Sequence, residues 1–313
     1  MSLRVYSGTA NPDLTAKIVS HLAITPGDIK IGRFADGELN VKIGESTRDA
    51  DVFIVQPTCA PVHDMVMELL IIIDAFRRAS AKRITAVIPY YGYSRQDKKV
   101  KPREPITAKL IANLITTAGA DRIVAVDLHA RQVQGFFDVP VDHLPAAPII
   151  ADYLMASGVT SKNIVVVSPD VGGVARASEL AALISAPIAI IVKRRPEPNV
   201  AEAVEIVGDV NGKTVIMLDD MIDTGGSVIA GANALLARGA TEVYAAATHG
   251  LFSGDAPEKL DASPIKEIIV TDTIPLRDRE RHPKVTVLSV AELLARAIER
   301  IHRHMSVSKL FER

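Results

Sequence analysis

The chain has 313 residues, which is enough for about two domains with full hydrophobic cores. Hydrophobic residues make up 48% of it and charged residues 23%, as in a globular protein in water. The formal net charge of −1 excludes a global field that would attract nucleic acid or an anionic membrane, and the single cysteine, Cys59, excludes an internal disulfide.

Residues 1–11 lack the apolar core of a secretion signal. The most apolar run, 65–76, is too short to span a bilayer and contains Glu68 and Asp74. We therefore expect a cytoplasmic protein with no membrane partner and no nucleic-acid partner.

Strand-like apolar runs alternate with helical runs along the whole chain. The expected strands are 3–6, 52–56, 84–88, 123–126, 164–167, 189–192, 214–218, 243–248 and 267–271. The expected helices are 12–21, 62–80, 107–118, 147–157, 174–184, 227–237 and 290–302. This alternation predicts an α/β fold with mostly parallel sheets flanked by helices on both faces.

The chain also repeats itself in outline, because the strand, helix and strand over 51–94 recur over 213–253. We therefore predict two related domains, 1–146 and 147–313, with the last residues able to pack on the first domain. The alternative explanation of this repeat is that any two halves of an α/β protein look alike at this level of detail. The first copy has prolines at positions 57 and 61 where the second has an acidic glycine loop, so it lacks N–H donors for a phosphate.

Two segments of the first domain carry side chains suited to a nucleotide. Phe34 can stack on an adenine ring, and Asp36 or Glu38 can accept hydrogen bonds from its amino group. Arg95 can grip a phosphate with two hydrogen bonds, with Gln96 beside it. Alternatively, Phe34 lies in a solvent-facing turn and Arg95 in a basic loop, and neither binds a ligand.

Two candidate metal ligands stand beyond the carboxyl ends of expected strands, where open α/β sheets place their ligands. His129 follows strand 123–126, and Asp170 follows strand 164–167. Together with substrate phosphates and water they could hold a divalent ion. A histidine at a strand end also often bonds only to backbone, so both interpretations stay open.

A basic cluster, Lys193, Arg194 and Arg195, follows strand 189–192. Alone, it is typical of a solvated strand end. Beside a phosphate site, positioned cations would stabilise the charge that spreads over equatorial oxygens during phosphoryl or diphosphoryl transfer.

The most informative segment follows the apolar strand 214–218. Asp219 and Asp220 come first, and then a loop opens a helix. The loop residues are Asp223, Thr224, Gly225, Gly226 and Ser227. Glycine backbone, hydroxyl donors and a helix N-terminus together suit the phosphate of a sugar phosphate. The acidic pair can accept hydrogen bonds from ribose hydroxyls or face a metal ion.

This segment also allows two alternatives. Aspartate and glycine are ordinary at strand ends and turns, so the loop could be purely structural. The Asp-Thr-Gly run also matches an aspartic protease, but that chemistry needs two facing carboxylates, and only one such run occurs.

The segment resembles the phosphoribosyl-diphosphate-binding motif of the type I phosphoribosyltransferase fold. The resemblance extends along nearly the whole chain to the class I ribose-phosphate diphosphokinases, also called phosphoribosyl diphosphate synthetases. The other matching stretches are RFADGE at 33–38, PYYGYSRQDKK at 89–99, DLHA at 127–130, QGFFDVPVD at 134–142, SPDVGG at 168–173 and VKRR at 192–195. Several separate motifs in the right order make the match highly specific.

The resemblance implies transfer of the diphosphoryl group of ATP to the 1-hydroxyl of ribose 5-phosphate, for nucleotide biosynthesis. It implies Mg²⁺ at His129 and Asp170, and Lys193 and Arg195 as catalytic residues on a mobile loop. The implied ATP-binding residues are Phe34, Asp36, Gly37, Glu38, Arg95 and Gln96. The implied ribose 5-phosphate-binding residues are Arg195, Asp219, Asp220, Asp223, Thr224, Gly225, Gly226 and Ser227.

The family also implies a homo-oligomer, a hexamer by resemblance, in which Phe34, Asp36 and Glu38 cross a subunit interface to complete a shared ATP site. A phosphoribosyltransferase would share the loop 223–227, but has no reason to carry the nucleotide segments in a second α/β domain. A non-catalytic regulatory homologue is disfavoured because the catalytic and metal-binding positions are intact.

Overall fold

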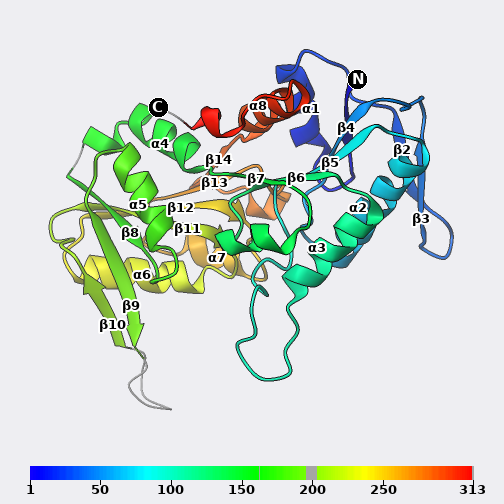
Figure 1. Cartoon of the computed structure of the whole chain (residues 1–313). Coiled ribbons are helices and arrows are strands. Elements are labelled where there is room, and N and C mark those ends of the chain that lie inside the picture. The colour runs from blue at the N-terminus through cyan, green and yellow to red at the C-terminus, as the bar shows by residue number, and fades with distance from the viewer. Residues whose placement is uncertain (162, 195–202, 312–313) are drawn as a thin grey trace. The chain divides into compact units, whose positions relative to one another are not determined.

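The computed structural model describes residues 1–161, 163–194 and 203–311, and the chain divides into two compact units (Figure 1). Unit 1 comprises Met1–Leu144, Thr273–Pro275 and the segment from Ser289 onward. Unit 2 comprises Pro145–Asp272 and Leu276–Leu288. The division falls after Leu144 rather than after residue 146, and helix α8 (Ala291–His302) belongs to unit 1.

Unit 1 is built on a parallel five-stranded sheet with the order β1-β4-β5-β6-β7. The strands are β1 (Leu3–Ser7), β4 (Asp51–Val55), β5 (Arg83–Ile88), β6 (Arg122–Val126) and β7 (Val141–Leu144). The helices are α1 (Pro12–His21), α2 (Val62–Arg78), α3 (Thr107–Ala118) and α8, with 3₁₀ turns at Arg131–Phe136 and Ser308–Leu310. Side chains of β4 and β5 pack against α2 and α3 in one buried cluster.

Helices α1 and α8 come from opposite ends of the chain and lie side by side, in blue and red in Figure 1. Helix α1 begins after Asn11, whose side chain accepts a hydrogen bond from the Leu14 N–H at 3.2 Å. The amphipathic pattern of α8 buries Leu294, Ile298 and Ile301.

A polar cluster fixes the end of α8 to the sheet of unit 1. Arg83 Nε donates to the buried Asp51 carboxylate at 2.7 Å, and His302 Nδ1 lies 2.8 Å from the same carboxylate. Arg83 also donates to the Ile301 carbonyl at 3.0 Å. A buried carboxylate needs such partners, so the cluster ties the last helix to the first unit.

An antiparallel hairpin of β2 (Ile29–Arg33) and β3 (Leu39–Ile43) stands between α1 and β4 in the chain. This hairpin was not predicted. Its apolar and polar residues alternate, as in half-buried strands, but they form no continuous apolar run.

Unit 2 contains a seven-stranded sheet with the order β10-β9-β8-β11-β12-β13-β14, in which only the β10–β9 pair is antiparallel. The strands are β8 (Ile164–Ser168), β9 (Ile188–Arg194), β10 (Ala203–Val207), β11 (Thr214–Ile222), β12 (Glu242–Gly250), β13 (Glu267–Thr271) and β14 (Val285–Leu288). The helices are α4 (Ala147–Ala156), α5 (Val174–Leu183), α6 (Gly226–Ala237) and α7 (Ala256–Asp261), with 3₁₀ turns at Val159–Ser161 and Asp278–Glu280.

Strand β11 shows why this sheet is covered on both faces. Val215 and Met217 belong to one buried cluster, whereas Ile216 and Leu218 belong to another. Successive side chains of a strand point to opposite faces, so both faces of β11 are packed.

The two units share one topology. Without the β10–β9 edge, the order β8-β11-β12-β13-β14 repeats β1-β4-β5-β6-β7. In each unit an antiparallel strand pair lies in the chain between the first two strands of that order, β2–β3 in unit 1 and β9–β10 in unit 2. The predicted α/β fold with two related, mostly parallel arrangements is confirmed.

Every expected strand and long helix is present, with shifts at the ends. The largest shift is in β11, which continues to Ile222 because Asp219 and Met221 still pair with Ala247 and His249 of β12. The short elements β2, β3, β7, β10, β14 and α7 were not predicted. Within the described part of the chain, none of the helices combines the length and apolar character needed to cross a bilayer.

Candidate functional site

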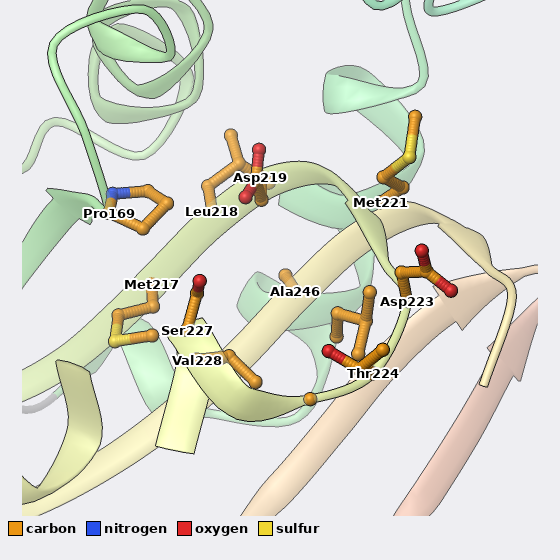
Figure 2. A pocket seen from close by; sticks show the side chains of 12 residues that line it. Pro169, Met217, Leu218, Asp219, Met221, Asp223, Thr224, Ser227, Val228 and Ala246 are labelled. Carbon is orange, nitrogen blue, oxygen red and sulfur yellow. The ribbon is translucent and has the colours of Figure 1, made fainter. Parts of the chain in front are cut away.

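A pocket with a volume of about 130 Å³ lies in unit 2, where β11 leads through a loop into α6. Figure 2 shows the side chains of Asp219, Asp223, Thr224 and Ser227 arranged around this bend. Pro169, from the loop after β8, also lines the pocket. The structure therefore brings together most residues that the sequence predicts for a sugar phosphate.

Gly225 makes the bend possible. Its φ of +75° is left-handed, which glycine adopts without strain. A Cβ there would lie 3.2 Å from Leu260 Cγ, so α7 packs closely beneath the loop. Gly225 is also the N-cap of α6 and has no side-chain oxygen for the first N–H groups of the helix. An anion in the pocket can take that role and gains from the helix dipole.

The acidic pair lies within β11 rather than beyond its end, which corrects the predicted strand boundary. The Asp220 N–H donates to Asp219 Oδ1 at 2.8 Å. The Asp219 side chain is 35% exposed and lines the pocket. Asp220 is only 3% exposed and is not among the pocket-lining residues. The two carboxylates are therefore not equivalent.

Arg176, in the first turn of α5, was not predicted from the sequence. Its Nη1 lies 3.7 Å from Asp219 Oδ1 and 3.6 Å from Asp220 Oδ1, and its side chain is 15% exposed. Burial and the neighbouring Asp220 charge raise the pKa of Asp219 to about 7, while Arg176 acts in the opposite direction. The sequence signal was faint: one arginine among small apolar residues of a half-buried helix.

The candidate metal ligands lie on two loops that are each fixed by local hydrogen bonds. Asp170 is exposed, and its Oδ1 accepts the Gly173 N–H at 2.8 Å, just before α5. His129 is exposed after β6, next to Leu128, whose N–H donates to His143 Nε2 at 3.1 Å. Among the residues that the structure describes, no group of three or more His, Cys, Asp or Glu side chains could hold a metal.

The first nucleotide segment forms the turn of the β2–β3 hairpin. Phe34 is 54% exposed at this turn. Its N–H donates to the Glu38 carbonyl at 2.8 Å, and its carbonyl accepts the Gly37 N–H at 2.9 Å. Asp36 Oδ1 accepts the Glu38 N–H at 3.1 Å, so this carboxylate also shapes the turn. The turn holds an aromatic ring out to solvent.

The second nucleotide segment leads into α3. Arg95 is exposed in this loop. Gln96 lies beside it, and its Oε1 accepts the Thr107 hydroxyl at 2.5 Å, while its carbonyl accepts the Ala108 N–H at 3.2 Å. The Gln96 side chain thus helps to begin α3.

The first turn of α2 contacts both nucleotide segments, which sequence patterns did not reveal. Asp64 Oδ2 lies 3.2 Å from Arg33 Nη2, next to the exposed Phe34. The adjacent His63 hydrogen-bonds through Nδ1 with the Tyr93 hydroxyl, and the two rings are 5.9 Å apart. Tyr93 has a left-handed φ of +65° two residues before Arg95. Neighbouring residues of one helix therefore hold both segments.

The predicted catalytic cluster is described only in part. Lys193 lies within β9, paired with Val204 of β10, because the strand runs to Arg194 rather than ending at residue 192. Arg195 lies outside the described residues.

Known proteins resemble this chain over almost its full length. The N-terminal domain of ribose phosphate pyrophosphokinase matches residues 3–119, and the phosphoribosyl synthetase-associated domain matches residues 189–312. The ribose-phosphate pyrophosphokinase of Caldanaerobacter subterraneus subsp. tengcongensis is 57% identical over 99% of this chain and 98% of its own. Ribose-phosphate pyrophosphokinase 1 of Spinacia oleracea is 54% identical over 99% of this chain and 93% of its own.

A solved structure agrees with these sequence matches. The crystal structure of phosphoribosylpyrophosphate synthetase from Mycobacterium smegmatis superposes with a TM-score of 0.92 at 45% identity, covering 97% of this chain and all of the other. The fold, with its repeated parallel sheets, is that of a phosphoribosyltransferase-like α/β protein. Within that class, the chain belongs to the ribose-phosphate pyrophosphokinase family.

Proposed function

We propose that this protein transfers the diphosphoryl group of ATP to the 1-hydroxyl of ribose 5-phosphate, giving 5-phosphoribosyl 1-diphosphate and AMP. The supporting observation is the pocket at the end of β11, where an acidic strand, a left-handed glycine and an uncapped helix start meet in a chain of this family. A cytoplasmic location is also proposed, because a single cysteine fits a reducing compartment.

The loop 223–227 binds the 5-phosphate in this proposal. The N–H groups at the start of α6 and the hydroxyls of Thr224 and Ser227 donate to its oxygens. Asp219 accepts hydrogen bonds from the ribose hydroxyls, and the Asp220 N–H, which donates to Asp219 Oδ1 at 2.8 Å, helps to orient its carboxylate.

The nucleotide binds at Phe34, Asp36, Gly37 and Glu38 and at Arg95 and Gln96. Stacking on the exposed Phe34 ring suits adenine, and the Arg95 guanidinium suits a phosphate. We propose that the protein assembles into a homo-oligomer in which the hairpin turn of one subunit completes the ATP site of another.

In the reaction, the sugar 1-hydroxyl attacks the β-phosphorus of ATP in line. The new bond joins that oxygen to the β-phosphorus, the bond from the β-phosphorus to the oxygen retained by AMP breaks, and the hydroxyl proton is released. Lys193 and Arg195 stabilise the charge that develops on the transferred group. Because the motifs offer no covalent nucleophile, positioning supplies most of the rate.

The Asp170 carboxylate fits the preference of Mg²⁺ for oxygen ligands, whereas an imidazole such as that of His129 is a less common Mg²⁺ ligand. Asp170 supplies carboxylate oxygen and His129 an imidazole, both exposed, and Mg²⁺ in nucleotide enzymes typically takes few protein ligands and completes its shell with phosphate and water. When bound, it would neutralise phosphate charge.

The test is incubation with ATP, Mg²⁺ and ribose 5-phosphate, followed by separation of the nucleotides and sugars. AMP and 5-phosphoribosyl 1-diphosphate should form in equal amounts. ADP as the product, or AMP without the diphosphorylated sugar, would refute the proposal. A second reaction with 5-phosphoribosyl 1-diphosphate and free nucleobases tests for a phosphoribosyltransferase, and nucleotide formation there would favour that rival.

The same assay tests the catalytic cluster. Lys193→Ala and Arg195→Ala should each lower turnover on the order of 100-fold or more, with smaller effects on KM, because their charge matters most in the transition state. Arg194→Ala, a matched neighbour, should be mild. Unchanged turnover with a raised KM would assign Lys193 and Arg195 to substrate binding instead.

A further inference from the structure

Arg176 places one positive charge beside two negative ones, Asp219, which lines the pocket, and Asp220, which does not. Its Nη1 lies 3.7 Å from Asp219 Oδ1 and 3.6 Å from Asp220 Oδ1. The distances exceed those of direct hydrogen bonds, so the interaction is mainly one of charge. It acts from α5 on residues of β11, two elements that are far apart in the sequence but in contact in the fold.

The burial and mutual repulsion of the two carboxylates make the positive charge of Arg176 important. Asp220 is 3% exposed, and burying an ionised carboxylate is costly unless it is paired. Asp219 and Asp220 are consecutive and repel each other, and together with burial this raises the pKa of Asp219 to about 7. A protonated carboxyl loses acceptor capacity, which would weaken its hold on sugar hydroxyls.

Building on the proposed function, we infer that Arg176 is a positioning residue for ribose 5-phosphate. Its guanidinium favours the ionised form of the Asp219–Asp220 pair and attracts both carboxylates, so that Asp219 presents acceptor oxygens to the vicinal hydroxyls of the sugar. Arg176 does not itself line the pocket and therefore acts through the carboxylates.

Other titratable groups lie on the neighbouring elements and loops. His249 of β12 pairs in register with Met221, Asp223 follows β11, and Asp170 lies in the loop after β8. A protonated His249 would act in the same direction as Arg176, so the experiment must separate them.

The experiment is calorimetric titration of the full chain with ribose 5-phosphate between pH 5.5 and 8.5. For the natural protein, affinity should rise through pH 7, because Asp219 and the phosphate of the ligand both ionise in this range, and then level off. The ligand is the same for every variant, so a difference between variants reports on the protein. In Arg176→Gln the midpoint should move up by about one pH unit or more, which corresponds to roughly fivefold weaker binding at pH 7. Arg176→Lys keeps the charge and should return the midpoint close to its natural value.

Arg238→Gln is the matched control, because it removes an exposed arginine at the end of α6, away from the pair, and should leave the curve unchanged. His249→Gln should keep the midpoint, and a midpoint that vanishes in this variant would assign the titration to His249 and overturn the inference. ATP binding, measured on each variant, verifies that the chain is folded.

The remaining outcomes separate the two proposals. If Arg176→Gln gives the natural curve, or if Arg176→Gln and Arg176→Lys lose affinity equally at every pH, Arg176 has no charge-specific role and the inference fails. If the natural protein does not bind ribose 5-phosphate even at pH 8.5, the proposed function itself fails.

Discussion

At the scale of single residues, the two protonation states of Asp219 have opposite effects. The ionised form favours binding of the sugar phosphate, whereas the protonated form favours the folded state. Its pKa in the folded chain is about 7, against 3.8 for an ordinary aspartate, so the folded state holds this proton more tightly than the unfolded state. Between these values the unfolded chain has released the proton and the folded chain has not. The contribution of Asp219 to stability is therefore greatest below pH 4 and is lost as the pH rises towards 7.

Asp219→Asn should consequently stabilise the ligand-free protein at pH 8, because asparagine cannot ionise. The gain should be about 1 kcal/mol, since a side chain that is 35% exposed is partly screened by solvent. It should shrink at pH 5, and ribose 5-phosphate binding should be lost. Urea unfolding at the two pH values, with and without the sugar phosphate, measures both effects.

Asp255→Asn is the control for this prediction. A hydrogen bond from Lys259 lowers the pKa of Asp255 at the surface, so its removal should not stabilise the protein at pH 8. Equal stability changes for Asp219→Asn at pH 5 and pH 8 would show that its ionisation is not the cause.

At the scale of elements, the loop between β11 and α6 depends on Gly225. Gly225→Ala should weaken ribose 5-phosphate binding by about tenfold or more, because the left-handed φ and the contact with Leu260 would displace N–H donors that bind a charged group. ATP binding should remain. Separate titrations with each ligand measure this.

Gly254→Ala provides the comparison. Gly254 also has a left-handed φ, +64°, but a Cβ there meets no atom within 4 Å. It should cost similar stability and leave both ligands bound. If Gly254→Ala weakens sugar phosphate binding as much as Gly225→Ala, general strain explains the loss and the loop has no special role.

The link between the hairpin and α2 is a second property at this scale. Asp64→Asn and Arg33→Gln should each raise the KM for ATP roughly threefold to fivefold, the upper part of the range expected for an exposed ion pair. The double variant should be no worse than either single one, because both remove one interaction. The KM for ribose 5-phosphate should not change.

Asp74→Asn is a control on the same helix, since Asp74 pairs with Arg78 at 2.7 Å in an equally exposed position. It should leave the KM for ATP at its natural value. If Asp64→Asn behaves in the same way, α2 does not position the hairpin for the nucleotide.

At the scale of the whole molecule, the shared ATP site can be tested by complementation. Phe34→Ala and Lys193→Ala chains should each be nearly inactive. After mixing and reassembly, some activity should return, because some interfaces would pair an intact hairpin with an intact Lys193. Inactive mixtures, once mass measurements have demonstrated subunit exchange, would place the complete site within one chain.

The sequence was sufficient to predict the elements that are buried on both faces. Strands such as β4, β8 and the first half of β11 are continuous apolar runs, which parallel sheets require. Strands β3 and β14 contain half-buried and exposed positions, so no apolar run indicates them. The end of β11 was missed because its pairing with β12 outweighs the low strand propensity of Asp219 and Asp220.

For the site, the sequence revealed what is local and missed what is brought together by folding. Loop 223–227 is a contiguous motif, so its phosphate-binding chemistry can be predicted from the sequence alone. Arg176 is distant from Asp219 in the chain, and so is Asp64 from Arg33. No pattern along the sequence encodes such pairs, since the crossover connections of the sheets create them.

The position of α8 has a consequence for biosynthesis. Asp51 and Arg83 emerge early from the ribosome, but their partners on α8 are 251 and 218 residues further along the chain. Until these arrive, the carboxylate of Asp51 lacks His302, and α1 lacks the helix that packs beside it. The earliest unit to be synthesised is therefore the last to be completed, and a chain that stops short of α8 exposes an unfinished surface to chaperones and proteases.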